Sequence, residues 1–288
     1  MKKLLILAVM ALMLAACGSK ATKSGDVEKE SDPQSAADST VTEADVPELK
    51  TDTVSFHKEK GICTVGLSVD FPVEGNDSLV KAIASYIIDY IGGTPQEMKK
   101  GTRQTIQALG EELFNDFIAY CGDVDEDEYH ELFLYKQVNK TLETPTFVTF
   151  TATTSNYLGG LHPQGKEEGC TFSKKNGTSF SYDMMTRLDT PAFKQLVKEG
   201  LRNYFGVNEE GQPHSDEELT ETLTMYDGSI DDLPLPDAEP YLTDQGITFI
   251  YQSYEITFYA AGRPTFTIPF SEAKPFLKPQ ALNLFLND

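Results

Sequence analysis

The sequence predicts an α+β protein in which helices pack on an antiparallel sheet, arranged as two closely associated subdomains. Some runs are rich in the Val, Thr, Phe and Tyr of strands, and others repeat apolar residues every three or four positions, as helices do. The two kinds of run are grouped in blocks along the chain instead of alternating. Grouping in blocks is typical of α+β proteins, whereas regular alternation builds parallel α/β sheets.

The first block is predicted to be a hairpin followed by two helices. Residues 51–71 have strand composition on both sides of a turn at 58–61. Apolar residues at helical spacing predict one helix over 79–91, which Gly92 ends, and a second over 102–120.

The second block begins with strands at 129–141 and 145–157, and the second of these leads into a turn. Gly159 and Gly160 accept a positive φ, and Pro163 restricts the residue before it to extended geometry. The shape of this turn is therefore specified by its residues.

The later elements carry their own start and stop signals. Asn-Gly at 176–177 predicts a hairpin between strands at 169–173 and 178–182. The remaining expected elements are a capped helix over 189–205, a short helix at the capping box of Ser215 and Glu218, an ordered loop or lid over 227–240, strands over 246–251 and 264–270, and a short helix over 271–277.

The N-terminus has the features of a lipoprotein signal peptide. Lys2 and Lys3 precede an apolar run over 4–14, and small residues lead to Cys17 as in a lipobox. The run is shorter than the ~20 residues that span a bilayer. These features resemble those of bacterial lipoproteins. The resemblance implies cleavage before Cys17, attachment of a diacylglyceryl group with acyl chains such as palmitate to its thiol, and an extracytoplasmic place in the bacterial cell envelope, at the outer membrane. The alternative is an ordinary signal peptide with a chance cysteine.

Composition then divides the chain into four parts. Residues 1–16 form the signal peptide. Residues 17–50 lack aromatic residues and are predicted to be a disordered, lipid-anchored tether. Residues 51–144 form an N-terminal α+β part, and residues 145–288 form a second domain.

The acidic composition bears on the choice of partner. The chain has 24 Lys and Arg against 45 Asp and Glu, and loss of Lys2 and Lys3 leaves 22 basic residues and a net charge of −23. Nucleic acid is excluded because phosphates need a basic face. A negative field instead favours basic proteins as partners.

Apart from Cys17, three cysteines stand at wide spacings without a C-x-x-C pair: Cys63, Cys121 and Cys170. No metal site is predicted from them. In an oxidising compartment they form one disulfide and leave one free thiol, or all three remain reduced and buried. The sequence does not select the pair.

The sequence shows no catalytic, metal or cofactor motif. His130-Glu131 is followed by Leu134 where a zinc-binding helix needs a second histidine, and the aspartates that begin at Asp123 lack the glycine and glutamate of a calcium loop. Cys170 and His162 would form a nucleophile pair only by chance proximity, so we expect His162 to bond to backbone.

Five tyrosines either line a recognition surface or belong to the core with their hydroxyls at its edge. They are Tyr157, Tyr182, Tyr251, Tyr254 and Tyr259.

Two spaced segments resemble motifs of the RsiV/PdaC-like extracytoplasmic domain family. The first is Tyr157-Leu158-Gly159-Gly160-Leu161-His162-Pro163, which resembles its tyrosine-x-Gly-Gly-x-His motif and is followed by Thr178-Ser179-Phe180. The second runs from Tyr254-Glu255-Ile256 to Gly262-Arg263-Pro264, with Ile268-Pro269-Phe270 after it. Together they extend over about 145–277. The resemblance implies candidate binding or structural residues at Tyr157, Gly159, Gly160, His162, Pro163, Tyr254 and Glu255.

The same resemblance implies a binding function. In lysozyme-sensing anti-sigma factors the domain is an extracytoplasmic receptor, and in peptidoglycan deacetylases it accompanies a separate catalytic domain. We find neither companion in this sequence, so we do not expect those activities to transfer. We predict a lipid-anchored, non-enzymatic binding module for a basic protein such as lysozyme, or for cell-wall glycan. A cell-envelope enzyme with an unrecognised site and an envelope scaffold are the alternatives.

Overall fold

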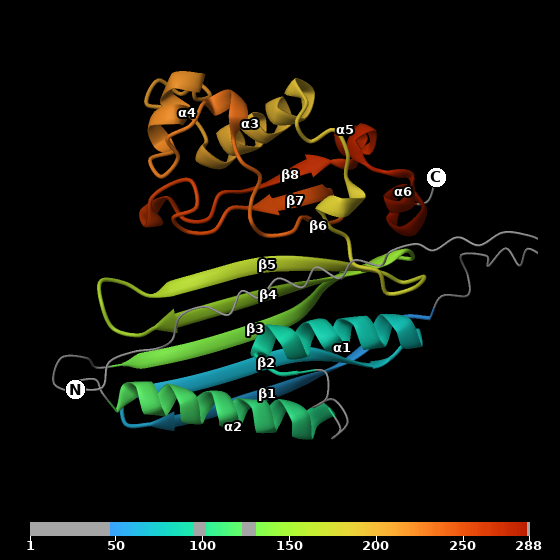
Figure 1. The fold of residues 1–288 in the computed structure, drawn as a ribbon, viewed down its shortest axis with the longest axis vertical. Coiled ribbons are helices and arrows are strands. Elements are labelled where there is room, and N and C mark those ends of the chain that lie inside the picture. Colours follow the sequence, from blue (N-terminus) through green and yellow to red (C-terminus); the bar gives the residue numbers. More distant parts are fainter. Residues whose placement is uncertain (1–46, 95–101, 123–130, 287–288) are drawn as a thin grey trace, which may run out of the picture. The chain divides into compact units, whose positions relative to one another are not determined.

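The computed structural model describes residues 47–94, 102–122 and 131–286 (Figure 1). These residues belong to one compact unit of the chain. Cys17, the signal peptide and most of the expected tether lie outside the described residues, as do the aspartates from Asp123 and the residue His130. Among the helices that are described, none is both long enough and apolar enough to cross a membrane.

The predicted α+β class is confirmed, and the strands form two sheets. The five-stranded sheet has the spatial order β1 (Lys50–Lys60), β2 (Cys63–Glu74), β3 (Leu132–Glu143), β4 (Phe147–Tyr157) and β5 (Gln164–Ser173). The three-stranded sheet has the order β6 (Tyr241–Leu242), β7 (Gly246–Ile250) and β8 (Thr265–Pro269). The helices are α1 (Asp77–Ile91), α2 (Thr102–Cys121), α3 (Pro191–Phe205), α4 (Asp216–Thr222), α5 (Phe270–Ala273) and α6 (Pro279–Phe285). Short 3-10 turns occur at Tyr182–Met184, Ile230–Asp232, Tyr259–Ala261 and Lys274–Phe276.

The first hairpin is confirmed, but one strand pairing differs from the expected antiparallel sheet. β1 and β2 pair antiparallel across a turn at Gly61-Ile62, which is tighter than the predicted turn. β2 and β3 pair in parallel. A parallel pair needs a long crossover, and here it contains α1 and α2, which cover one face of the sheet (Figure 1).

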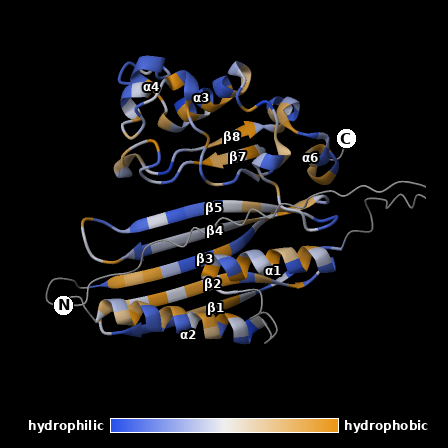
Figure 2. Cartoon of the chain, viewed as in Figure 1, coloured by the Kyte–Doolittle hydropathy of each residue, from blue (hydrophilic) through white to orange (hydrophobic). Residues whose placement is uncertain are grey.

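Local signals fix the bounds of α1. The Asn76 side chain accepts the N–H of Ser78 at the helix start, and Gly92 takes a left-handed conformation, with φ 98°, at its end. Figure 2 shows apolar residues along α1 and on β2 beside it. The buried face of the helix consists of Leu79, Ile83, Ala84, Ile87, Ile88 and Ile91. This face packs on the sheet, as the spacing predicts.

Two expected boundaries differ from the strand bounds. β1 begins at Lys50, and Leu49 before it is buried, so residues 49–50 belong to the folded part and not to the expected tether. The expected division between 144 and 145 falls between β3 and β4, which are hydrogen-bonded neighbours in one sheet. The sheet therefore continues across that division.

The predicted strand at 178–182 is wrong. The turn at Asn176-Gly177 is present, but beyond it only Ser179 forms a bridge, with Phe172 of β5. The next residue, Phe180, is buried against Phe285 of α6 in a second core. The chain leaves the first sheet because its next large apolar side chain packs in the other cluster.

The second core lies among α3, α6 and the three-stranded sheet. Pro191 starts α3, Gly206 ends it, and Ser215 with Glu218 forms the predicted capping box of α4. The stretch 227–240 is an ordered loop as expected, but its leucines contribute to this core instead of staying outside it. β6 and α6 were not predicted, because two residues and seven residues give little periodic signal.

A buried polar network joins the two sheets. The Thr149 and Thr171 hydroxyls lie 2.8 Å apart, and they bond the carbonyl and N–H of Leu242 in β6. Gly169 leaves room for the Tyr241 ring, because a Cβ at this glycine would lie 2.2 Å from that ring. These contacts hold the three-stranded sheet against β4 and β5.

Candidate functional site

The turn between β4 and β5 has the conformation that its glycines predict. Gly159 and Gly160 have φ of 86° and 106°, in the range that side chains disfavour. The Tyr157 hydroxyl donates a hydrogen bond to the Gly160 carbonyl at 2.9 Å. The turn over 158–163 is therefore tied to the strand that precedes it.

His162 brings this turn into contact with the second half of the protein. Its ring stacks on Tyr259 with centroids 3.6 Å apart and planes at 16°. Its Nδ1 lies 2.9 Å from the Pro163 carbonyl, which confirms the expected backbone bond, and its Nε2 lies 2.9 Å from the Tyr254 hydroxyl. Since a carbonyl only accepts, Nδ1 carries the proton, and a neutral ring then accepts the Tyr254 O–H at Nε2.

Tyr254 sits in a strained backbone conformation. Its φ is 68°, which is uncommon for a residue other than glycine, and its side chain is 46% exposed. The neighbouring Glu255 carboxylate accepts the N–H groups of Gln252 at 2.6 Å and of Asp237 at 2.7 Å. Burial raises the pKa of Glu255 against the lowering effect of these bonds. Glu255 thus shapes the loop that presents Tyr254.

Hydrogen bonds of the Gln252 side chain also join this loop to β5. The Gln252 side-chain amide donates to the Glu167 carbonyl at 2.8 Å, and its oxygen accepts the Glu167 N–H at 3.1 Å. The Tyr259 hydroxyl donates to the Pro163 carbonyl at 2.7 Å. The aromatic cluster of His162, Tyr254 and Tyr259 is therefore held from both sides.

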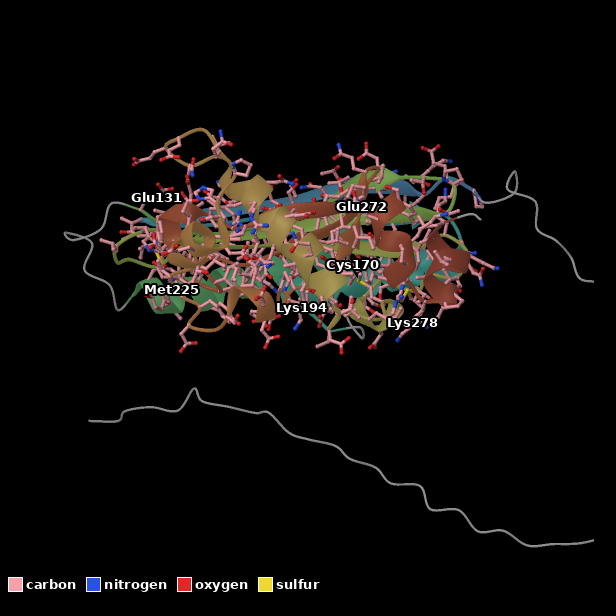
Figure 3. All side chains as sticks on the ribbon, turned by 90° about the horizontal axis from the view of Figure 1, so that it is seen from above. Glu131, Cys170, Lys194, Met225, Glu272 and Lys278 are labelled. Atoms are coloured by element: carbon pink, nitrogen blue, oxygen red, sulfur yellow. A yellow bond between two sulfur atoms is a disulfide. The ribbon has the colours of Figure 1, made fainter. Side chains whose placement is uncertain are left out.

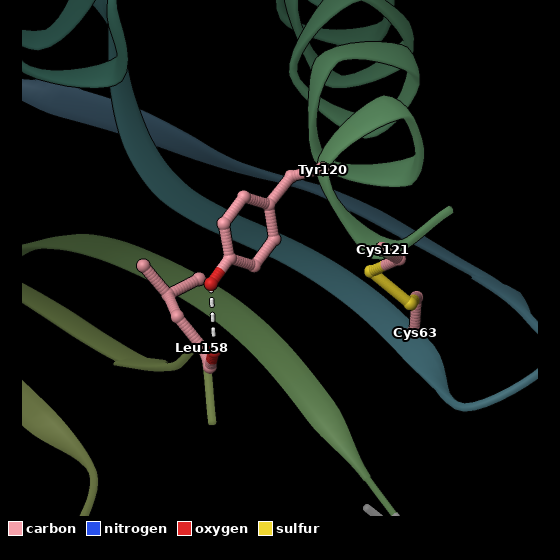
Figure 4. The surroundings of a disulfide bond; sticks show 4 residues. All are labelled: Cys63, Tyr120, Cys121 and Leu158. Atoms are coloured by element: carbon pink, nitrogen blue, oxygen red, sulfur yellow. Dashed lines mark hydrogen bonds between the residues drawn. A yellow bond between two sulfur atoms is a disulfide. The ribbon is translucent and has the colours of Figure 1, made fainter. Parts of the chain in front are cut away.

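Exposed apolar residues lie in the turn and next to Tyr259 in the sequence. Leu161 is 97% exposed at the tip of the turn, and Leu158 and Phe258 are also exposed. The Tyr120 hydroxyl at the end of α2 donates to the Leu158 carbonyl at 2.7 Å (Figure 4). The next residue, Cys121, is bonded to Cys63, so a disulfide fixes the helix end that supports the turn.

The five candidate tyrosines divide between the core and the surface. Tyr251 is fully buried, and Tyr157 and Tyr182 pack partly buried against core clusters. Tyr254 and Tyr259 form the surface cluster with His162. The core interpretation therefore holds for Tyr251, Tyr157 and Tyr182, and a recognition role for Tyr254 and Tyr259 stays a prediction.

The cysteines follow the first of the two predicted arrangements. Cys63 and Cys121 form a disulfide, and Cys170 is the free thiol among the described cysteines. Cys170, which is labelled in Figure 3, packs against the hydrophobic cluster that includes the buried face of α1, and burial raises the pKa of its thiol to about 12. A thiol this far from ionisation at neutral pH is a poor nucleophile. Within the described ranges no group of three His, Cys, Asp or Glu side chains is placed to hold a metal ion.

A groove beside the aromatic cluster was not predicted from the sequence. It has a volume of about 480 Å3, and its lining includes Glu167, Tyr204, Tyr259 and Arg263. Glu167 and Arg263 form an ion pair across 96 positions of the chain. Neither Glu167 nor Arg263 stands in a local sequence pattern that would have predicted this contact.

The fold and this surface define an α+β protein with a fixed aromatic cluster and an adjacent polar groove. Residues 183–271 match the model of DUF3298, described as a protein of unknown function, and the chain thus contains a DUF3298 domain. The match includes Tyr254, Glu255 and Tyr259 but begins after the turn that carries His162. The more specific resemblance to the RsiV/PdaC-like family stays a prediction.

Two solved structures are similar to this chain in fold. One is a DUF3298 family member from Bacteroides fragilis, with 20% identity, a TM-score of 0.58, and coverage of 81% of this chain and 95% of that one. The other is a DUF3298 family protein from Pseudomonas aeruginosa, with 15% identity, a TM-score of 0.52 and the same coverage. No curated protein matches the sequence.

Proposed function

We propose that this protein is a lipid-anchored binding module of the bacterial cell envelope, and that its partner is a basic extracytoplasmic protein. The observation that carries the proposal is Leu161, a leucine 97% exposed at the tip of the turn. A single exposed apolar residue is ordinary. Leu161, however, shares its turn with Leu158 and directly precedes His162, whose ring bonds Tyr254. Leu158 and Tyr254 are also exposed, and grouped apolar exposure marks interaction surfaces.

The rigidity of this surface supports a binding role. His162 stacks on Tyr259 and bonds Tyr254, while Tyr120 holds Leu158 through its backbone carbonyl. A surface that is already ordered loses little conformational entropy when a partner binds. Tyrosine, which presents large rigid contact area, is also enriched at the cores of protein interfaces.

Charge supports the choice of a basic partner. The chain has 45 acidic against 24 basic residues, and oxygen-ended side chains project around its rim (Figure 3). A field of this sign steers cationic proteins and repels anionic ones. Lysozyme is the first protein to test, because the family resemblance suggests it and it is strongly basic.

We expect the full-length chain to bind lysozyme, and Leu161→Ser to weaken this binding at least about tenfold, the effect of losing one buried apolar anchor. Binding should also weaken as salt rises, because the Debye length falls from ~10 Å at 0.1 M to ~3 Å at 1 M. Calorimetry at two salt concentrations measures both effects.

Val207→Ser is the matched control, because Val207 is an exposed apolar residue that follows α3 and is not part of the turn over 158–163. It should leave the affinity unchanged. The proposal would be rejected if Leu161→Ser and Val207→Ser lost the same affinity for lysozyme. It would also be rejected if the protein bound only acidic proteins at low salt. Cleavage of labelled peptidoglycan by the purified protein would favour the enzyme alternative instead.

The membrane anchor is tested separately at Cys17. We expect Cys17→Ala to abolish lipidation and leave the precursor uncleaved, because the thiol is the acceptor in the lipobox. Metabolic labelling with a radioactive fatty acid and membrane fractionation measure this result. Normal processing and membrane retention of the variant would contradict the lipoprotein assignment.

A further inference from the structure

The groove beside the aromatic cluster combines a charged pair with two fixed aromatic walls. It lies among β5, α3 and the segment before β8, and its volume is about 480 Å3. That volume falls within the range of small-molecule sites. Its lining is separate from Leu161, on which the proposed protein contact depends.

A hydrogen-bond donor and an acceptor stand side by side in this groove. The Arg263 Nη2 lies 3.1 Å from Glu167 Oε2, and both side chains remain about one third exposed, at 33% and 37%. Gly165 permits this arrangement, since a Cβ there would lie 3.1 Å from Arg263 Nη1. The pair has no net charge, so it favours neither an anion nor a cation. It offers N–H groups and a carboxylate oxygen to a neutral ligand.

Two tyrosine rings form the walls, and hydrogen bonds fix both. The Tyr204 hydroxyl donates to the Ala261 carbonyl at 2.8 Å, and the Tyr259 hydroxyl donates to the Pro163 carbonyl at 2.7 Å. One face of Tyr259 is covered by His162. The rings therefore offer flat apolar surface in fixed positions, while their hydroxyls are already engaged.

We propose that this groove binds a saccharide that carries an acetamido group. An acetamide presents an N–H for Glu167 and a carbonyl for Arg263, which matches the adjacent acceptor and donor. The negative face of a tyrosine ring attracts the polarised C–H groups of a pyranose. A peptide shares the amide chemistry, but it also needs pockets for its side chains, whereas this groove is open and lined by polar groups. The saccharide is a second ligand in addition to the proposed protein partner.

The test is calorimetric titration of the full-length chain with the trimer of N-acetylglucosamine. We expect saturable binding, and binding at least about tenfold weaker for cellotriose, which has hydroxyls in place of the acetamido groups. Arg263→Ala and Tyr204→Leu should each weaken binding at least about tenfold. Tyr204→Phe keeps the ring but loses its hydrogen bond to Ala261, so it should bind more weakly than wild type and more tightly than Tyr204→Leu.

Arg103→Ala is the matched control for the arginine, because Arg103 is exposed on α2. It should bind the trimer as wild type, and so should Leu161→Ser, which separates this site from the protein contact. If Arg263→Ala does not fold, Arg263→Lys replaces it, and this variant should lose affinity because lysine lacks the planar fork. The proposal would be overturned if the trimer does not bind, if cellotriose binds equally well, or if Arg263→Ala binds the trimer with full affinity. Binding of a dipeptide with blocked ends, without binding of the trimer, would also overturn it.

Discussion

Replacing Cys63 and Cys121 together with serine is expected to lower the free energy of unfolding by about 4 kcal/mol. The disulfide joins the first residue of β2 to the last residue of α2, with a sequence separation of 58. A cross-link over a loop of this length restricts the unfolded chain considerably, and its removal restores that entropy. Urea unfolding of the oxidised protein and of the double variant, followed by circular dichroism, measures the difference.

Two controls separate the cross-link from the loss of thiol packing. Cys170→Ala leaves the disulfide intact and should cost much less, because only one partly buried sulfur is removed. Wild-type protein unfolded in the presence of a dithiol reductant should resemble the double variant. A double variant within about 1 kcal/mol of the oxidised wild type would contradict the prediction, since it would leave the loop constraint without effect.

The elements that the sequence predicted are those with local signals. α1 has an apolar stripe and a terminal glycine, and α4 has a capping box, so each depends on residues within a few positions of one another. The parallel pairing of β2 with β3 depends on where a crossover of two helices returns the chain. That return is decided by packing of the whole sheet and leaves no local trace in the sequence.

Competition between the two cores explains the hairpin prediction that failed. The Asn-Gly turn formed as its residues predict, but the strand after it did not, because Phe180 is buried in the other cluster. Packing between distant segments also decided which cysteines pair. The distance between Cys63 and Cys121 depends on how α2 packs on β2, so spacing alone did not choose the pair.

The candidate site was partly predictable. The family motifs contained His162 and Tyr254, which the structure joins over a sequence separation of 92. The motifs did not reveal that these residues touch, nor that Leu161 is exposed beside them. Glu167 had no motif of its own, and its pairing with Arg263 follows only from the docking of the three-stranded sheet on β5.

Glu143 lies at a buried ionic junction at the end of β3. Its carboxylate accepts hydrogen bonds from Lys174 at 2.6 Å, from the Leu49 N–H at 2.9 Å and from Lys140 at 3.0 Å. Lys174 is only 5% exposed, so its charge depends on this partner. Burial acts to raise the pKa of Glu143, but the bonds from Lys174, Leu49 and Lys140 outweigh it and hold the pKa below the ordinary value of 4.5.

Glu143→Ala is expected to lower the free energy of unfolding at pH 7 by about 3–5 kcal/mol, because it leaves the Lys174 ammonium buried without a counter-charge. Glu74→Ala is the matched control, since Glu74 pairs with Lys50 at the surface and its loss should leave the free energy of unfolding nearly unchanged. The lowered pKa also sets the pH dependence: the Glu143 contribution is present above pH 4.5 and is lost as pH falls through the folded-state pKa. Urea unfolding at a series of pH values should therefore show wild type and Glu143→Ala converging in acid. A difference that stayed constant from pH 7 to acid pH would show that the loss comes from packing and not from the charge of Glu143.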